Sequence, residues 1–345
     1  MRAVQAAAFG GPDVLEVQEI ERPRPGPGEV LVKLAFSGVN YMDIYMRSGI
    51  YARSDTYKTP LPMTIGMEGA GVVEELGEGV TEFRAGDRVA YCLSRGSYAE
   101  FAVVPAWRVV PVPPSLSLEV ATAAMLQGST AHYLTHSAFK LEAGHVCLVH
   151  AGVGGVGQIL VQLAKLRAAT VIATVGDETK AEIAKRCGAD HCILYRQQDF
   201  RSKVMEITDG RGVNVAYDSV GKDTIHQSIR SVRRRGLCVL FGASSGPVAS
   251  IEPIELAEAG SVFFTRPHLS DYMADAGEIR SRAADLFAAV ESKKLIFAIH
   301  GVMPLEDAVE AHRLMEGRSS RGKLLLSTAS KGAQTLDPIG HAQNT

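Results

Sequence analysis

Closely spaced glycines in the middle of the chain have the pattern of a dinucleotide-binding turn. The Gly-x-Gly-x-x-Gly motif and the residues inside it are Gly152, Gly154, Gly155, Val156 and Gly157. The motif follows the apolar run 145–151 and opens the amphipathic segment 158–167, and this strand–turn–helix context is what makes the motif informative. Glycines let backbone N–H groups approach a pyrophosphate, and the helix N-terminus adds partial positive charge. The sequence therefore predicts a dinucleotide cofactor at this turn.

The next apolar run, residues 170–175, is predicted to be a strand, and the residues at the end of this strand distinguish NAD sites from NADP sites. An NAD site needs a carboxylate at this tip to accept from the ribose 2′-hydroxyl. Here the tip is Gly176, which leaves room for a phosphate that Lys180 could reach as a point charge. Asp177 and Glu178 indicate NAD instead if the strand runs further, and Lys180 could be a solvated surface residue. The pattern favours NADP.

This half of the chain alternates strand-like and helix-like segments. Strands are predicted at 145–151, 170–175, 191–196, 213–220 and 236–243, and helices at 158–167, 178–187 and 199–208. Strands that alternate with helices of this length form right-handed parallel sheets. We therefore expect a doubly wound α/β domain over residues 126–267.

The first 125 residues are predicted to be rich in β-structure. Short apolar runs at 14–20, 29–39, 69–76, 86–91 and 96–104 are separated by Pro and Gly. A helix should follow, with Ser115 or Ser117 as its N-cap. Later segments (277–294, 305–317 and 322–327) are expected to return to this domain, which then comprises residues 1–125 and 268–330. Residues 331–345 are predicted to be a flexible tail.

Composition narrows the class of protein. Of 345 residues, 46% are apolar and 21% charged, which excludes a largely disordered or fibrous chain. The net charge of −2 gives no reason to expect binding to nucleic acid or to an anionic membrane. The sequence shows no secretory signal and no 18-residue apolar run, so a cytoplasmic protein without a membrane span is expected. Five cysteines without a Cys-x-x-Cys pair predict neither a disulfide framework nor a zinc knuckle.

Several longer motifs occur in a fixed order along the chain. They are FGGPDVLEV, GVNYMDIYMRSGIY, IGMEGAGVVEELGEGV, FRAGDRVAY, HAGVGGVGQILVQLAK, YDSVG, RRRGLCVLFGASSG and FFTRP. This series resembles the zinc-free quinone oxidoreductases related to zeta-crystallin, within the medium-chain dehydrogenase/reductase superfamily. The resemblance implies a Rossmann domain beside a β-rich GroES-like catalytic domain, with NADPH as cofactor and a quinone as acceptor.

The resemblance also bears on zinc. Zinc alcohol dehydrogenases of this superfamily carry Cys-His where this chain has Asn-Tyr (40–41), and His-Glu where it has Met-Glu (67–68). A catalytic zinc needs about three protein ligands, and the stretch expected to hold structural zinc, 91–100, offers only Cys92. We expect no zinc. Alcohol oxidation would then lack a Lewis acid, whereas reduction of a quinone or enone needs only placement and a proton.

Individual site residues follow by resemblance. Asn40, Tyr45 and Tyr51 would line the nicotinamide and acceptor cleft as catalytic residues. The remaining residues would bind the cofactor: Thr130 beneath it, Lys180 and Tyr195 at the 2′-phosphate, Ser219 near the adenine, and Phe241, Gly242, Ser244, Phe264 and Arg266 at the ribose and nicotinamide. Arg321 would reach the cofactor from the C-terminal segment. For Asn40 the alternative is a helix N-cap, and for the two tyrosines it is core packing.

Other functions and partners remain alternatives. An enone, 2-alkenal or enoyl-thioester reductase would share the fold and cofactor. A non-catalytic role in NADPH or RNA binding is less favoured, because the dense basic run Arg233-Arg234-Arg235 is expected to be the solvated end of a helix. The apolar run Val262–Thr265 is predicted to be a sheet edge that pairs with a second copy in a homodimer.

Overall fold

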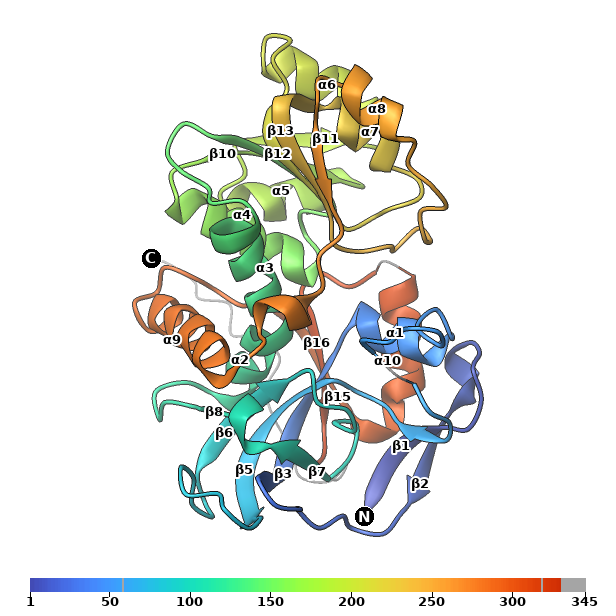
Figure 1. Ribbon diagram of the computed structural model, residues 1–345, viewed down its shortest axis with the longest axis vertical. Coiled ribbons are helices and arrows are strands. Elements are labelled where there is room, and N and C mark those ends of the chain that lie inside the picture. Colours follow the sequence, from blue (N-terminus) through green and yellow to red (C-terminus); the bar gives the residue numbers. More distant parts are fainter. Residues whose placement is uncertain (58, 318, 330–345) are drawn as a thin grey trace, which may run out of the picture.

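The computed structural model describes residues 1–57, 59–317 and 319–329, so the predicted tail at 331–345 lies outside the described residues. The molecule is elongated, with two halves stacked along its longest axis (Figure 1). One half is a parallel sheet covered by helices, and the other is built mainly of antiparallel strands.

The upper half contains six parallel strands in the order β11-β10-β9-β12-β13-β14. Their bounds are β9 Val146–Val149, β10 Thr170–Val175, β11 His191–Leu194, β12 Val213–Asp218, β13 Val232–Leu240 and β14 Phe263–Thr265. The chain enters at the middle of the sheet and winds outward to both edges, which is the doubly wound order of dinucleotide-binding domains. This confirms the predicted fold class of this half.

Alternate residues of these strands face opposite helical layers. The helices are α4 Gly155–Leu166, α5 Glu178–Arg186, α6 Phe200–Ile207, α7 Ile225–Arg230 and α8 Pro253–Glu258. Cys147 and Val149 of β9 lie in the core cluster that includes α4 and α5, whereas Leu148 lies in the cluster with α6 and α7. Both faces of the sheet are thus buried, as the nearly continuous apolar strands require.

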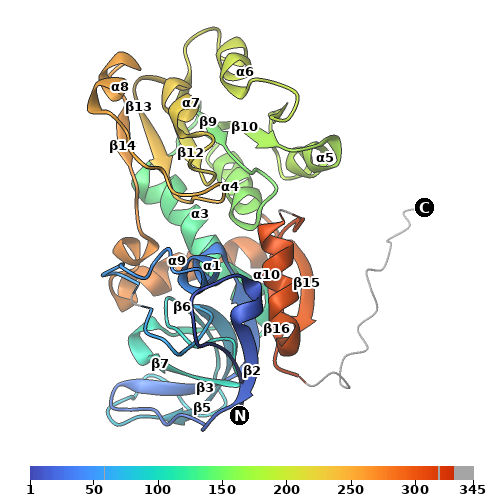
Figure 2. The same ribbon diagram turned by 90° about the vertical axis from the view of Figure 1, so that its right-hand side faces the viewer.

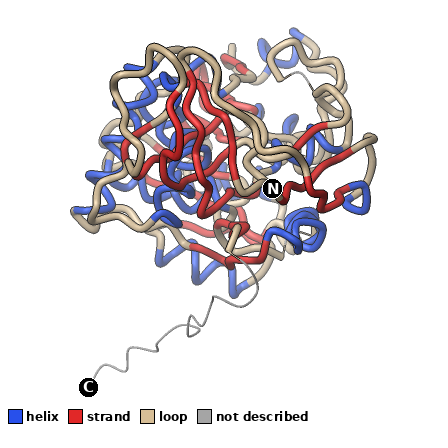
Figure 3. Tube along the Cα trace, turned by 90° about the horizontal axis from the view of Figure 1, so that it is seen from below, coloured by secondary structure: helices blue, strands red, loops and turns tan. Residues whose placement is uncertain are grey.

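The lower half contains two sheets. The larger has the order β15-β16-β3-β5-β6-β8, with β7 also paired to β3, and the smaller has the order β2-β1-β4. Their bounds are β1 Arg2–Ala6, β2 Leu15–Glu19, β3 Glu29–Val39, β4 Met63–Thr64, β5 Glu68–Leu76, β6 Arg88–Cys92, β7 Phe101–Pro105, β8 Val110–Pro111, β15 Ile299–Pro304 and β16 Lys323–Ser327. From below, these strands are seen grouped among long loops (Figure 3). Late in the chain, β16 pairs antiparallel with β3.

A helical column connects the halves (Figure 2). It comprises α2 Leu118–Ala123 and α3 Ser129–Tyr133, each followed by a π-helical turn, 124–128 and 134–138. Ser117 caps α2, since its hydroxyl accepts from the Val120 N–H. The remaining helices are α1 Tyr41–Arg47, α9 Ala276–Glu291 and α10 Ala308–Glu316, with short 3-10 turns at 12–14, 106–108, 269–272 and 305–307.

The arginine run does not end a helix, so that prediction was wrong. Helix α7 ends at Arg230, and Arg233, Arg234 and Arg235 belong to β13. The pairing of β12 with β13 shifts register across this stretch, because β13 contains more residues than β12 opposite it. The arginines form this irregular segment, with Arg234 and Arg235 exposed to solvent.

Candidate functional site

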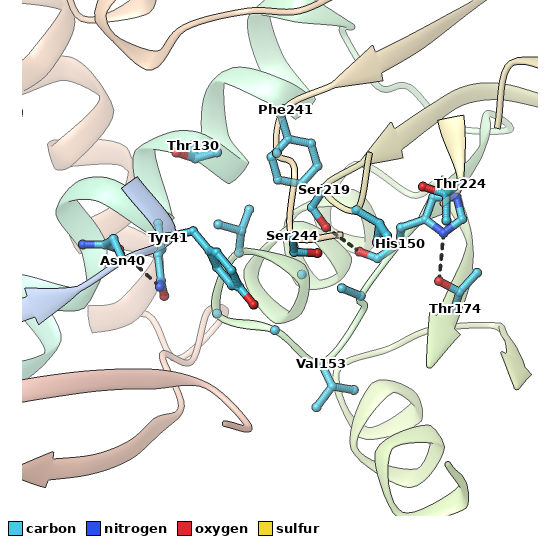
Figure 4. A pocket seen from close by; sticks show the side chains of 18 of the residues that line it. Asn40, Tyr41, Thr130, His150, Val153, Thr174, Ser219, Thr224, Phe241 and Ser244 are labelled. Atoms are coloured by element: carbon cyan, nitrogen blue, oxygen red, sulfur yellow. Dashed lines mark hydrogen bonds between the residues drawn. The ribbon is translucent and has the colours of Figure 1, made fainter. Parts of the chain in front are cut away.

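A cavity of about 590 Å³ lies between the two halves. This volume is typical of small-molecule and cofactor sites. Side chains from α1, the helical column and the loops after β9, β10, β12 and β13 line it (Figure 4). Most predicted site residues are in its wall: Asn40, Tyr45, Tyr51, Thr130, Gly154, Gly155, Val156, Gly157, Gly176, Lys180, Tyr195, Ser219, Phe241, Gly242, Ser244 and Arg266.

Three predicted cofactor residues do not line the cavity. Gly152 lies behind the turn, where an added Cβ would be 2.8 Å from the Ala173 Cβ, so its role in the structure is close packing on β10. Phe264 packs with the core cluster under α6 and α7. Arg321 is exposed, and its backbone N–H donates to His300.

Two positions of the glycine turn, Gly155 and Gly157, leave no space for a larger side chain. Gly154 is the N-cap of α4 and has an extended conformation. A Cβ on Gly157 would lie 2.2 Å from the Ala151 carbonyl oxygen, and one on Gly155 would lie 2.1 Å from the Gln127 Oε1. The start of α4 lines the cavity from Gly154 to Gly157. The N-terminus of a helix at this place suits a pyrophosphate.

The carboxyl end of β10 combines a glycine with basic and hydroxyl groups. β10 ends at Val175, and Gly176 lines the cavity. The Asp177 carboxylate caps α5 by accepting from the Lys180 N–H at 2.9 Å, and it is not part of the cavity wall. A Cβ on Gly176 would lie 3.4 Å from the Tyr195 hydroxyl and 3.6 Å from the Arg196 Nε. This tip suits a phosphate better than a ribose 2′-hydroxyl.

Arg196 at this tip was missed in the sequence. It could have been found from its position directly after Tyr195 and beyond the end of β11, because β11 is parallel to β10 and the two strands end at the same edge of the sheet.

A buried hydrogen-bond network supports the floor beside the glycine turn. His150 Nδ1 lies 3.0 Å from Thr174 Oγ1 (Figure 4). Its Nε2 lies 2.9 Å from Ser228 Oγ. Ser228 in turn donates to the buried Asp218 carboxylate at 2.6 Å. Burial lowers the pKa of His150, so the imidazole is neutral at pH 7 and links β9 to β10 and α7.

Aromatic side chains form the opposite end of the cavity. The ring centroids of Tyr45 and Tyr51 are 5.4 Å apart, those of Tyr51 and Tyr57 are 5.2 Å apart, and His268 follows at 5.3 Å. The Tyr45 hydroxyl accepts from the Ala243 N–H at 2.9 Å, a contact between the two halves that leaves its own proton available for donation. Burial raises the pKa of Tyr45 to about 12. The hydroxyl therefore stays protonated at neutral pH.

Asn40 lies at the centre of a buried polar network. Its Nδ2 donates to Glu68 Oε2 at 2.9 Å, and its Oδ1 accepts from Lys323 Nζ at 2.8 Å and from Gln127 Nε2 at 3.4 Å. Lys323 also donates directly to Glu68, and each side chain of this ion pair is at most 1% exposed. Asn40 is also the N-cap of α1, in a capping box with Asp43.

Lys323 and Gln127 belong to no sequence motif, so their place in this network could not be predicted from the sequence. The Gln127 Oε1 is buried and has no hydrogen-bond partner among the described residues.

These residues do not fit a zinc ion. A catalytic zinc takes thiolate, imidazole and carboxylate ligands, whereas here the Glu68 carboxylate is paired with an ammonium and an amide. Cys92 is buried, and its thiol faces the Met125 carbonyl. Within the described ranges, no three His, Cys, Asp or Glu side chains lie close enough to share a metal ion.

Asp43 should make stability depend on pH. Burial raises its pKa to about 7, and its Oδ1 has no hydrogen-bond partner in the part of the chain that the structure describes. The folded state therefore holds a proton that the unfolded state releases near pH 4, so this carboxyl lowers stability as pH rises from about 4 to about 7. We expect wild type to lose stability relative to Asp43→Asn across this window in urea unfolding experiments. A constant difference from pH 4 to pH 8 would contradict this.

Comparison with known proteins agrees with this architecture. Residues 26–114 match the alcohol dehydrogenase GroES-like domain, and residues 155–286 match the family described as zinc-binding dehydrogenase. A quinone oxidoreductase from Pseudomonas aeruginosa is 38% identical over 94% of this chain and 99% of its own length. The chain belongs to the quinone oxidoreductases of the medium-chain dehydrogenase/reductase superfamily.

A solved structure and a second curated relative extend the comparison. The crystal structure of Escherichia coli quinone oxidoreductase complexed with NADPH is 36% identical, has a TM-score of 0.91, and is matched over 95% of this chain and 100% of that chain. A 2-haloacrylate reductase from a Burkholderia species is 42% identical over 92% of this chain and 96% of its own length. The predicted family, the Rossmann domain and the GroES-like domain are thus confirmed. In the described residues no helix has the length and apolar character needed to cross a bilayer.

Proposed function

We propose that this protein is an NADPH-dependent quinone oxidoreductase that binds its acceptor between the two halves. The observation that carries this is the continuity of one cavity from Lys180 and Tyr195, past the glycine turn, to Tyr45 and Tyr51. One end supplies the groups that suit a 2′-phosphate, and the other offers aromatic faces and hydroxyls. An extended dinucleotide followed by a flat, electron-poor acceptor fits this order.

The residues that line the cavity suit this cofactor. The glycine turn would hold the pyrophosphate, Lys180, Tyr195 and Arg196 would hold the 2′-phosphate, and Ser219 would lie near the adenine. Thr130, Phe241, Gly242, Ser244 and Arg266 would enclose the ribose and nicotinamide. NADPH, when bound, supplies the hydride.

The chain itself must place the acceptor and hold a proton. The ring faces of Tyr45, Tyr51 and Tyr57 suit stacking against a quinone and exclude water from it. Reduction of a quinone by a hydride also requires a proton, and the Tyr45 and Tyr51 hydroxyls hold theirs at neutral pH because burial raises both pKa values. The Arg266 guanidinium opposes this rise in pKa at both tyrosines, and at Tyr51 it does so through a hydrogen bond as well as through its charge.

The test is consumption of NADPH in the presence of 1,4-benzoquinone, 9,10-phenanthrenequinone and a 2-alkenal, with EDTA controls. Quinone turnover that EDTA leaves unchanged is expected. Binding of NADPH without turnover of any acceptor would overturn the proposal and favour a non-catalytic role.

An enone or enoyl-thioester reductase is the second candidate. It is favoured by the similarity to a 2-haloacrylate reductase, whose name implies a substrate with an activated double bond. Turnover of the 2-alkenal alone would select it and would leave the cofactor assignment intact.

Lys180 should determine the preference for NADPH over NADH. Replacing it with Gln removes a charge-assisted contact to the 2′-phosphate, so we expect KM for NADPH to rise roughly 10- to 100-fold while KM for NADH changes little. Lys185→Gln, on the same helix but paired with Glu182 at the surface, is the matched control. Equal effects on the two nucleotides would refute the assignment.

We further propose a homodimer formed through β14. This strand is an edge of the six-stranded sheet, and Phe263 on it is 65% exposed. Pairing with β14 of a second copy would cover both the strand edge and this ring. Sedimentation equilibrium should give the mass of two chains for wild type and of one chain for Phe263→Asp. A single-chain mass for wild type at micromolar concentration would exclude the dimer.

A cytoplasmic location is part of the same proposal. All five cysteines are free thiols in the structure, which suits a reducing compartment.

A further inference from the structure

A second, smaller cavity adjoins the acceptor end of the first. Its volume is about 150 Å³, and Tyr57 and Leu93 belong to the walls of both cavities. The side chains of Arg95 and Arg108 line it, together with the hydroxyl residues Thr56 and Ser270. Two cations thus lie just beyond the aromatic row.

Neither arginine has a counter-charge within the described part of the chain. Arg95 Nε and Arg108 Nη1 are enclosed and have no hydrogen-bond partner. Burial lowers the pKa of both guanidinium groups, and the groups that oppose this at Arg108 are Cys92 and Tyr57, which are uncharged at neutral pH. Both arginines nevertheless remain protonated. Two enclosed donors on neighbouring cations are costly unless an anion binds them.

Other enclosed arginines of the described residues have at least one ion pair or hydrogen bond, even where a nitrogen is left without a partner: Arg47 pairs with Glu316, Arg280 pairs with Glu82, and Arg233 donates to the Arg234 carbonyl. Arg2 pairs with Glu100 and Glu306, Arg88 donates to two backbone carbonyls, and Arg282 donates to the Tyr272 carbonyl. Arg95 and Arg108 therefore depart from the pattern of the rest of the chain.

Trp107, which is not part of the wall of the smaller cavity, holds the Arg108 side chain in its orientation. Its guanidinium stacks over the Trp107 ring, with 4.3 Å between the guanidinium carbon and the ring centroid. Stacking uses the face of the guanidinium and leaves its N–H edge available.

We propose that Arg95 and Arg108 bind the carboxylate of the acceptor, so that the preferred substrates are quinones or enones that carry a carboxyl group. This inference rests on the proposed function of the main cavity. The electron-poor ring or double bond would lie against Tyr45 and Tyr51, and the carboxylate would reach past Tyr57 and Leu93. The N–H edges of guanidinium groups match the two oxygens of a carboxylate, and the smaller cavity has room for that group with a few waters at about 30 Å³ each.

The first experiment compares kcat/KM for matched acids and neutral compounds: 2-chloroacrylate with its methyl ester, and a naphthoquinone carboxylate with 1,4-naphthoquinone. Wild type should prefer the acids. In Arg95→Gln and in Arg108→Gln the ratio of acid to neutral kcat/KM should fall roughly 10- to 100-fold, the range expected for a lost charge-assisted contact. Arg84→Gln, which removes an exposed arginine of the same half, should keep the wild-type ratio.

A second measurement does not depend on turnover. Calorimetric titration with 2-chloropropionate, the saturated acid, should show binding to wild type that both variants lose, whereas chloride and inorganic phosphate at equal concentration should not displace it. Melting curves check that the variants are folded.

The outcomes separate the two proposals. Reduction of neutral quinones with no acid preference and no binding of 2-chloropropionate would overturn the carboxylate site and leave the proposed function standing. Arginine-dependent binding without turnover of any acceptor would support the site and overturn the proposed function.

Discussion

Lys323→Met should lower the free energy of unfolding by about 3–5 kcal/mol, the usual cost of leaving one member of a buried ion pair unpaired. Glu68 is fully buried, and its other hydrogen bonds come from the Asn40 amide and the Leu126 N–H. Without the ammonium its carboxylate must remain charged in an apolar surrounding or take up a proton. Urea unfolding at pH 7 measures the loss.

A double-mutant cycle tests whether the ion pair is the cause. Glu68→Gln with Lys323→Met removes both charges, so the double variant should be more stable than Lys323→Met alone. Lys33→Met, at an exposed position on β3, is the control for lysine removal and should change stability by less than about 0.5 kcal/mol. A double variant as unstable as the sum of the two single variants would show that Glu68 and Lys323 act independently.

Gly157→Ala should both destabilise the fold and abolish NADPH binding. The new Cβ would be 2.2 Å from the Ala151 carbonyl oxygen and 2.9 Å from the Gly152 carbonyl carbon, and both are backbone atoms that a rotamer change cannot move. Overpacking of this kind costs about 1–3 kcal/mol, and it would displace the N–H groups that face the pyrophosphate. Urea unfolding measures the free energy of unfolding, and fluorescence titration measures the affinity for NADPH.

Gly154→Ala is the matched control for stability. Its Cβ would lie 3.3 Å from the same carbonyl with no other contact within 4 Å, at a backbone conformation open to alanine. This variant should keep the wild-type free energy of unfolding. A stable Gly157→Ala with unchanged NADPH affinity would contradict the role of this turn.

The parts of the fold that depend on local pattern were predictable. The strand–turn–helix around Gly154 and the alternation of strands and helices follow from nearby residues, and the six-stranded order agrees with them. The NAD or NADP alternative depended on one question, whether Asp177 faced the cofactor. Only the structure shows its carboxylate capping α5.

The polar network at the acceptor end could not be predicted in the same way. Glu68 and Lys323 are 255 residues apart, and they meet because β16 pairs with β3 beside β5. Arg95 and Arg108 carry no sequence motif, and their shared cavity arises from loop packing. Phe264 and Arg321 were assigned by resemblance, but the direction of each side chain is set by local packing and exposure that the motif does not encode.

The pairing of β16 with β3 also has a consequence for the order of folding during synthesis. The complete six-stranded sheet lies between these two strands in the chain, so it leaves the ribosome before β16 does. Domains generally fold as units while the chain is being made. The dinucleotide half can therefore fold first. Glu68 has no ion-pair partner until Lys323 has been synthesised, so the acceptor end of the cavity is complete only after translation has passed residue 327.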